Sequence, residues 1–275
     1  MQVTIKDCFD LGRIANSGQC FRVKQFGNDF YRFILSNHVL YIRKVDCSHY
    51  DVSCTLDEWN NVWLDYFDHH RDYSCIENVI PQNDTFLKRA YSEGKGIRIL
   101  HQDHWETLIT FIISQRKSIP AIKQSVELLA EQFGTPITTP FETVHTFPTV
   151  SALSGISLAD LQNIKVGYRD QYILSAIEKV SDGIISLNDI EDLSDIDLFD
   201  ALCQIKGVGK KVANCVCLFS YGRTALVPID TWIKKVIDAH YNGVDPFPKF
   251  GAFAGIIQQY IFNYSIQHKE DFNNG

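Results

Sequence analysis

The chain has 275 residues, of which 45% are hydrophobic and 21% charged, and its formal net charge is -7 at pH 7. This length and composition predict a folded protein of two or three lobes and exclude a disordered chain. No apolar run approaches the roughly 20 residues needed to span a bilayer, and no early run has the pattern of a signal peptide. We therefore expect a soluble intracellular protein without a membrane partner, cytoplasmic if its source is prokaryotic.

The first 50 or so residues predict strands, because short segments rich in β-branched and aromatic residues alternate with turn-forming sequences. These segments are VTIKDCF, QCFRVKQF, DFYRFIL and HVLYIRKV. From Asp57 onward the apolar spacing becomes helical, and Asp103 is placed to cap the helix that contains Trp105. The predicted fold is α+β, with a small antiparallel sheet domain over 1–74 and a mainly helical body of two lobes over 75–275.

The eight cysteines, at positions 8, 20, 47, 54, 75, 203, 215 and 217, form no CxxC pair and no ligand cluster. This spacing argues against a zinc site and against an iron–sulfur cluster. We expect free thiols that are mostly buried, and no metal or other cofactor.

Charge is distributed unevenly along the chain, although the net charge by itself speaks against a nucleic-acid partner. Residues 182–200 carry seven acids and no base, whereas 203–235 carry six bases and the single acid Asp230. Such a change of sign suggests one face made for polyanions and another that faces water. Ordinary surface patchiness is the alternative on charge alone.

Residues 195–222 predict a helix, a short turn at Gly207 and Gly209, and a second helix, so that a helix-hairpin-helix occupies about 196–221. The glycines permit positive φ and expose backbone N–H groups, and the dipole of the second helix adds to an anion site suited to phosphate. Lys206 and Lys210 flank the turn. A Gly-x-Gly turn alone is a weak signal, and a turn used only for packing remains an alternative.

Lys211 lies in the first turn of the second helix, where the helix dipole, partial burial and neighbouring Lys210 disfavour its charged form. A neutral amine is what a Schiff-base-forming lysine needs. Asp230 stands directly before an amphipathic stretch, so its default role is an N-cap, but its carboxylate is also suited to accept a proton from Lys211 and to stabilise a sugar cation. An exposed lysine that only contacts phosphate is the alternative.

The hairpin, the lysine and the later aspartate resemble the signature of the helix-hairpin-helix DNA glycosylases. Further blocks resemble, in order, those of the Ogg-type 8-oxoguanine DNA glycosylases. They are SGQCFR (17–22), GIRILHQDHWETLITFIISQ (96–115), VGYRDQYI (166–173), CQIKGVGKKVANCVCLF (203–219) and AGIIQQYIF (254–262). The resemblance implies a cleft between two helical lobes and a bifunctional glycosylase and AP lyase that acts on oxidised guanine in double-stranded DNA. We expect the protein to be a monomer by default.

The same resemblance implies roles for individual residues. Lys211 is the nucleophile and Asp230 the catalytic carboxylate. The backbone carbonyl of Gly18 accepts a hydrogen bond from the N7–H that oxidised guanine has and guanine lacks. Phe262 and Cys215 would sandwich the flipped base and Gln258 would bind its Watson–Crick edge, although core packing is the alternative for Phe262 and Cys215. DNA contacts are expected from Arg116, Tyr168, Arg169, Lys206, Gly207, Gly209, Lys210 and Trp232.

Several positions depart from the family pattern. A segment that is usually asparagine-rich begins here with Arg116, and Ala121 stands where an arginine is expected. Trp232 replaces a histidine near the aspartate, and Lys206 replaces the proline before the hairpin. The first two losses concern groups that bind cytosine opposite the lesion, so we expect a weaker preference for cytosine over adenine there.

Two rival functions remain open from the sequence. The first is a helix-hairpin-helix glycosylase for another lesion, such as alkylated purines or oxidised pyrimidines. Lys211 argues against alkylated purines, and the missing four-cysteine cluster argues weakly against oxidised pyrimidines. The second is a DNA-binding scaffold without chemistry, against which Lys211 and Asp230 speak together.

Overall fold

The structure is a computed structural model that describes residues 1–272. Its tertiary contacts divide the chain into two compact units. The first unit contains residues 1–33, 40–101 and the chain from 222 onward, and the second contains 34–39 and 102–221. Each unit therefore draws on separated stretches of sequence, and the predicted domain boundary near residue 74 stays a prediction.

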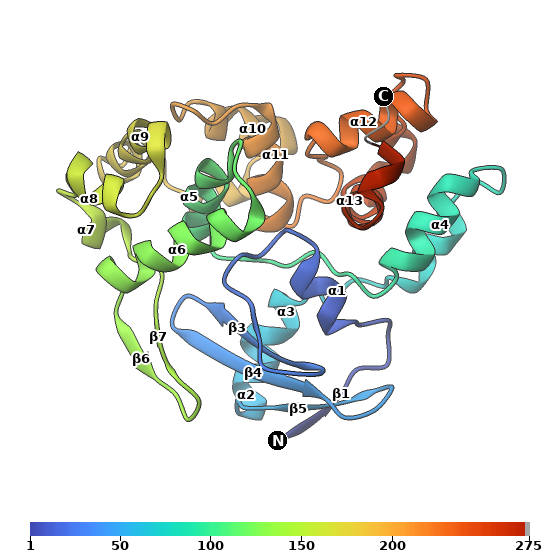
Figure 1. Cartoon of the computed structure of the whole chain (residues 1–275), viewed down its shortest axis with the longest axis horizontal. Coiled ribbons are helices and arrows are strands. Elements are labelled where there is room, and N and C mark those ends of the chain that lie inside the picture. Colours follow the sequence, from blue (N-terminus) through green and yellow to red (C-terminus); the bar gives the residue numbers. More distant parts are fainter. Residues whose placement is uncertain (273–275) are drawn as a thin grey trace. The chain divides into compact units, whose positions relative to one another are not determined.

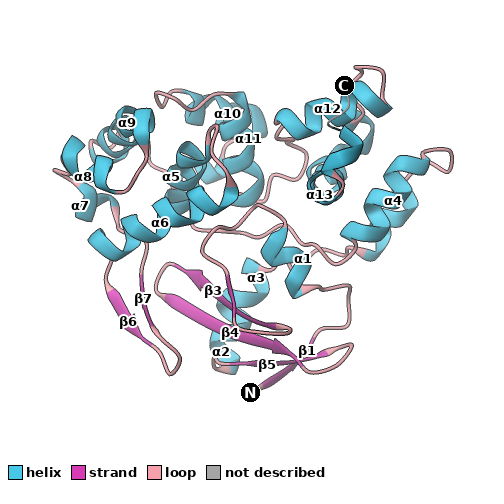
Figure 2. Ribbon diagram, in the orientation of Figure 1, coloured by secondary structure: helices cyan, strands magenta, loops and turns pink. Residues whose placement is uncertain are grey.

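Within the described residues, the N-terminal strands form an antiparallel sheet in the order β1-β5-β4-β3-β2, drawn in magenta in Figure 2. The α+β fold class predicted from the sequence is confirmed. The register pairs Gln2 with Asp51 and Lys24 with Arg32. The strands are β1 (Gln2–Thr4), β2 (Lys24–Gln25), β3 (Phe30–Leu35), β4 (His38–Lys44) and β5 (His49–Val52).

The first two predicted strands were wrong over most of their length. Pairing there is limited to β1 and β2, and a short helix, α1 (Leu11–Asn16), lies between them. Asp10 caps this helix by accepting a hydrogen bond from the Arg13 N–H at 2.9 Å, and Leu11, Ile14 and Ala15 are buried at helical spacing. A cap and a single apolar stripe over six residues are enough for the helix because it packs in the core.

The remaining core of the first unit is helical. In α13, buried residues lie on almost every side. Gly94 at the end of α4 allows this helix to approach α13 closely, because a Cβ there would lie 2.6 Å from the Tyr260 ring. The helices are α2 (Leu56–Glu58), α3 (Leu64–Tyr66), α4 (Thr85–Gly94), α12 (Thr231–His240) and α13 (Ala254–Gln267), which is coloured red in Figure 1.

The second unit is built around α5 (His104–Ser114), which packs against α6, α9 and α11. The predicted cap is confirmed, since Asp103 accepts a hydrogen bond from the Glu106 N–H at 2.8 Å. The other elements are α6 (Ile119–Phe133), β6 (Pro136–Thr138), β7 (Thr143–His145), α7 (Val150–Leu153), α8 (Leu158–Asn163), α9 (Asp170–Ser181), α10 (Asp195–Cys203) and α11 (Lys210–Phe219). The β6–β7 ribbon was not predicted.

The cysteines, all within the described residues, form no disulfides. The expectation that most are buried was wrong for half of them. Residues 20, 54, 215 and 217 are buried, whereas Cys8 and Cys47 are exposed and the others are intermediate. The exposed pair lies in loops beside the sheet strands, where the backbone runs over the surface.

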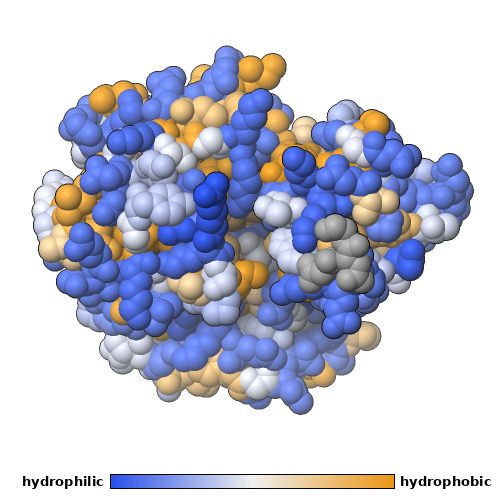
Figure 3. Space-filling model, turned by 45° about the horizontal axis from the view of Figure 1, so that its top comes forward, coloured by the Kyte–Doolittle hydropathy of each residue, from blue (hydrophilic) through white to orange (hydrophobic). Residues whose placement is uncertain are grey.

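The surface in Figure 3 is mostly hydrophilic, with hydrophobic side chains in small scattered groups. Large apolar side chains that are strongly exposed include Ile184, Ile196 and Val244. Among residues 1–272, no helix combines the length and the apolar character needed to cross a membrane.

Candidate functional site

The predicted helix-hairpin-helix is present in the second unit, where α10 ends at Cys203 and α11 begins at Lys210. Gly207 has φ +85°, and any Cβ there would overlap the ring of Tyr172 from α9. Gly209 is the N-cap residue of α11, and within the described chain no side chain caps this helix. The exposed turn therefore offers the first N–H groups of α11, at the positive end of the helix dipole, to an anion.

Lys211 lies in the first turn of α11 and is half-buried. Its Nζ is 5.0 Å from the centroid of the Phe111 ring in α5, which gives the ammonium or amine an apolar wall on one side. Cys215 follows one helical turn later and is buried. Residues four apart share a helix face, so Lys211 and Cys215 are neighbours on α11. Phe111 was not predicted, although it lies in the same sequence block as the helix cap.

Gln115 connects the hairpin with the segment that carries Tyr168 and Arg169. Its Nε2 donates to the Gly207 carbonyl at 3.1 Å, and its own carbonyl accepts from the Arg169 guanidinium, with Nε at 2.8 Å. The guanidinium also donates to the Val166 carbonyl at 3.0 Å, so that Arg169 is only 7% exposed. Tyr168 is 53% exposed, and the Arg169 guanidinium lies 4.4 Å from its ring centroid. Gln115 was not predicted, although it ends the quoted block 96–115.

Arg116 and Lys117 point in different directions. Arg116 is exposed and has φ +49°, a left-handed backbone conformation that is uncommon for any residue except glycine and asparagine. Lys117 turns inward, where its Nζ donates to Ser125 Oγ at 2.5 Å and to the Lys165 carbonyl at 2.7 Å. Burial lowers the pKa of Lys117, and the nearby Arg169 and Lys165 lower it further. Strained backbone at an exposed arginine is typical of a functional segment.

In the first unit, Gly18 lies directly against Phe262 of α13. Gly18 has φ +77°, and an added Cβ would lie 2.8 Å from Phe262 Cε1. The loop is held by Gln19, whose Nε2 donates to Ser17 Oγ and to the Arg98 carbonyl, both at 2.8 Å. The side-chain carbonyl of Gln19 accepts from the Leu100 N–H at 2.8 Å. The backbone of Gly18 is therefore fixed by a buried amide.

Gln258 lies one turn before Phe262 on α13 and is buried. Its Oε1 accepts a hydrogen bond from Gln259 Nε2 at 3.2 Å. The structure thus brings Gly18, Gln258 and Phe262 to one region of the first unit. Gly18 provides a backbone group, Gln258 a side-chain amide and Phe262 a half-buried ring.

Asp230 caps α12, because its Oδ1 accepts a hydrogen bond from the Ile233 N–H at 2.8 Å. The predicted N-cap role is confirmed. Trp232 in the same first turn is half-buried, with Lys235 Nζ 4.9 Å and Lys269 Nζ 6.0 Å from its ring. Asp230 belongs to the first unit and Lys211 to the second, so their pairing stays a prediction.

The comparisons with known proteins identify the family to which this chain belongs. Residues 2–108 match the family model described as 8-oxoguanine DNA glycosylase, N-terminal domain. The structure of MBOgg1 in complex with a low-affinity DNA ligand is similar over 98% of this chain and 96% of that chain, with a TM-score of 0.91 and 36% identity. The Clostridium acetobutylicum 8-oxoguanine glycosylase/lyase, in complex with double-stranded DNA containing cytosine opposite 8-oxoguanine, has a TM-score of 0.90 and 32% identity over 98% of each chain.

A curated relative is similar over a shorter stretch. The N-glycosylase/DNA lyase of Saccharomyces cerevisiae is 33% identical over 180 residues, which cover 61% of this chain and 47% of the yeast protein. The match to that relative therefore spans about half of its length, whereas the solved structures are matched over nearly their whole chains. The chain belongs to the family of Ogg-type 8-oxoguanine DNA glycosylase/lyases.

Proposed function

We propose that this protein is a base-excision-repair enzyme that removes 8-oxoguanine from duplex DNA and then nicks the strand on the 3′ side of the lesion. The observation that carries the proposal is the likeness to 8-oxoguanine glycosylases at 32–36% identity over 98% of the chain. The chain has both residues that the chemistry needs, Lys211 at the start of α11 and Asp230 at the cap of α12.

The DNA backbone is bound at the hairpin. A phosphate is placed against the N–H groups that follow Gly207 and Gly209, where the helix dipole and the exposed Lys206 and Lys210 favour an anion. These contacts position the duplex without reading its sequence. Tyr168, an exposed aromatic residue beside the hairpin segment, enters the stack where the damaged nucleotide leaves and offsets part of the lost stacking.

A small number of protein groups recognise the flipped base. The Gly18 carbonyl accepts the N7–H of 8-oxoguanine, and a normal guanine would leave this carbonyl facing another acceptor. Phe262 and Cys215 contact the two faces of the base, and Gln258 binds its Watson–Crick edge. The contact of Gly18 with Phe262 supports this assignment, because it puts the acceptor and one stacking ring side by side.

The reaction begins when the neutral Nζ of Lys211 attacks C1′ of the deoxyribose. A bond forms between nitrogen and C1′ while the bond from C1′ to N9 breaks, and the base leaves with the bonding electrons and takes up a proton. The Asp230 carboxylate stabilises the positive charge that develops on the sugar. Opening of the sugar ring gives an imine, after which loss of a C2′ proton expels the 3′ phosphate by β-elimination.

The direct test is incubation of the protein with duplexes that contain a single 8-oxoguanine, undamaged guanine, 3-methyladenine or 5-hydroxycytosine. Free base is measured by chromatography and strand cleavage on a denaturing gel. We expect release and cleavage with 8-oxoguanine and little with the others. Preferred release of the alkylated purine or the pyrimidine would move the protein to another lesion, and equal binding of all duplexes with no release would make it a DNA-binding scaffold.

A further inference from the structure

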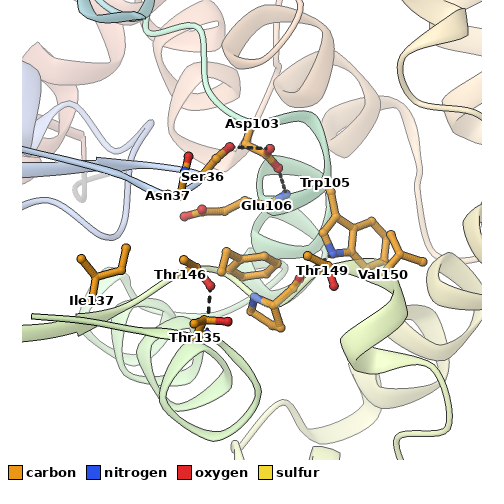
Figure 4. A pocket seen from close by; sticks show the side chains of 12 residues that line it. Ser36, Asn37, Asp103, Trp105, Glu106, Thr135, Ile137, Thr146, Thr149 and Val150 are labelled. Carbon is orange, nitrogen blue, oxygen red and sulfur yellow. Dashed lines mark hydrogen bonds between the residues drawn. The ribbon is translucent and has the colours of Figure 1, made fainter. Parts of the chain in front are cut away.

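A separate cavity of about 730 Å³ lies within the second unit, and none of the residues assigned above to DNA binding, base recognition or catalysis lines it. It is bounded by the tip between β3 and β4, the start of α5, the β6–β7 ribbon and the start of α7 (Figure 4). Its volume is in the range of pockets that bind small organic molecules. The lining residues are Ser36, Asn37, Asp103, Trp105, Glu106, Thr135, Ile137, Thr146, Phe147, Pro148, Thr149 and Val150.

The walls of this cavity are held in place by hydrogen bonds among its own lining residues. Trp105 Nε1 donates to the Pro148 carbonyl at 3.0 Å, which ties α5 to the segment after the ribbon. The Thr135 N–H donates to Thr146 Oγ1 at 3.0 Å, and the Thr146 N–H donates to the Thr135 carbonyl at 2.8 Å. The preceding residue, Gly134, must lack a side chain because a Cβ would overlap the Thr146 carbonyl. The pocket is therefore formed before any ligand arrives.

The cavity is lined by negative charge. Of the described residues that line it, the charged ones are Asp103 and Glu106, and both are acids. Asp103 is fixed, since it accepts from the Glu106 N–H at 2.8 Å and from Ser36 Oγ at 3.1 Å. Ser36 makes this bond from a left-handed backbone conformation with φ +52°, which is costly for a serine. Figure 4 shows the carboxylate of Glu106 reaching into the cavity below Ser36 and Asn37.

We propose that this cavity binds a small organic cation, a protonated amine attached to an aromatic or branched apolar body. Trp105, Phe147 and Val150 provide apolar surface for the body of the ligand. Because the indole N–H already donates to Pro148, Trp105 offers its ring rather than a donor, and a ring favours a cation. The carboxylates of Glu106 and Asp103 bind the ammonium group through charge-assisted hydrogen bonds. The same carboxylates repel DNA phosphate and other anions.

The inference is tested with phenethylamine, which is protonated at pH 7, and with its neutral and anionic counterparts, phenethyl alcohol and 3-phenylpropionate. Binding to the intact chain is measured by ligand-observed saturation-transfer NMR and by titration calorimetry. We expect phenethylamine to bind with a dissociation constant of about 1 mM, as suits so small a ligand. The alcohol should bind at least about fivefold more weakly and the acid not measurably.

Two variants and one control variant test whether the ligand binds in this cavity. Glu106→Gln should weaken phenethylamine binding about tenfold and leave phenethyl alcohol unchanged, since a charge-assisted bond is lost. Glu131→Gln, which removes an exposed acid of α6 outside the cavity, should change neither. Ile137→Trp fills the space and should abolish binding of both, with folding checked by thermal unfolding. Equal affinity for amine and acid, or unchanged amine binding in Glu106→Gln and Ile137→Trp, would overturn the proposal.

Discussion

Gly18 and Phe262 are in direct contact, with the position of a Gly18 Cβ only 2.8 Å from Phe262 Cε1 and with the Gly18 backbone at φ +77°. Each residue thus constrains the other. The close approach needs a residue without a side chain, and the left-handed backbone needs a residue that tolerates positive φ. The carbonyl that we assign to lesion recognition is held against the ring that we assign to base stacking.

Gly18→Ala should therefore impair excision far more than it impairs folding. The added methyl displaces Phe262 or the loop, and we expect the single-turnover rate on 8-oxoguanine to fall about 100-fold or more, the scale of losing a fixed hydrogen-bonding group. Gly183→Ala is the matched control, because Gly183 has φ +69° but nothing within 4 Å of an added Cβ. Both variants should lose about 1 kcal/mol of stability from backbone strain. Equal excision rates in the two variants would contradict the assigned role of Gly18.

Arg169→Lys should destabilise the second unit. A lysine cannot reproduce the forked donation to the Gln115 carbonyl together with the bond to the Val166 carbonyl, and a buried carbonyl loses its partner. We expect a loss of about 1.5–3 kcal/mol in the free energy of unfolding, measured by urea denaturation. Arg116→Lys, an exposed neighbour, should stay within about 0.5 kcal/mol of the parent. If the two variants unfold alike, Arg169 is not a structural link in solution.

Stability should depend on the protonation of His69 below neutral pH. Its ring packs against Phe9 and Trp59, with centroids 5.3 and 6.1 Å away, and burial lowers its pKa to about 3, with Arg98 adding to the effect. The unfolded state takes up a proton near pH 6.5, which the folded state resists until about pH 3. The stability that depends on neutral His69 is therefore fully present above pH 6.5 and is lost as the pH falls from 6.5 to about 3.

The variant His69→Phe keeps an aromatic ring and removes this proton. Between pH 7 and pH 5, the parent should lose about 2 kcal/mol more than the variant, measured by urea denaturation at each pH. The same loss in both proteins would show that His69 does not oppose protonation in the folded state.

Local features of the fold and site could be predicted from the sequence. The caps at Asp103 and Asp230 and the glycine turn at Gly207 depend on neighbouring residues, so a short window of sequence contains the information. The sheet class was also predictable from β-branched and aromatic runs. The α1 helix was not, because its six residues lie among β-favouring neighbours and are helical through tertiary packing.

Other features that could not be predicted depend on contacts between distant segments. Gln115 and Gly207 are 92 residues apart, and the inward turn of Lys117 depends on the Lys165 carbonyl. The cavity beside Trp105 is formed by four segments that no sequence window contains together. The pairing of Lys211 with Asp230 also joins distant segments, and it was inferred from chemistry and stays a prediction.

The base opposite the lesion should matter less than is usual in the family. Arg116 occupies the segment in which asparagines were expected, and its left-handed backbone presents a donor-only side chain at the exposed turn. The single-turnover excision rates with cytosine and with adenine opposite 8-oxoguanine should therefore differ by no more than about tenfold. This difference is smaller than one well-formed base contact can provide. Arg116→Asn should restore part of the preference for cytosine. A steep fall when adenine replaces cytosine in the parent protein would contradict this prediction.

The central claim is that the amine of Lys211 attacks the sugar, and borohydride trapping tests it most directly. The protein is incubated with an 8-oxoguanine duplex and sodium borohydride, and the products are separated on a denaturing gel. We predict a covalent protein–DNA adduct for the parent chain and for Lys210→Gln, and none for Lys211→Gln that still binds the duplex. An adduct of normal yield with Lys211→Gln would contradict the account, as would its absence from the parent chain under conditions in which base is released.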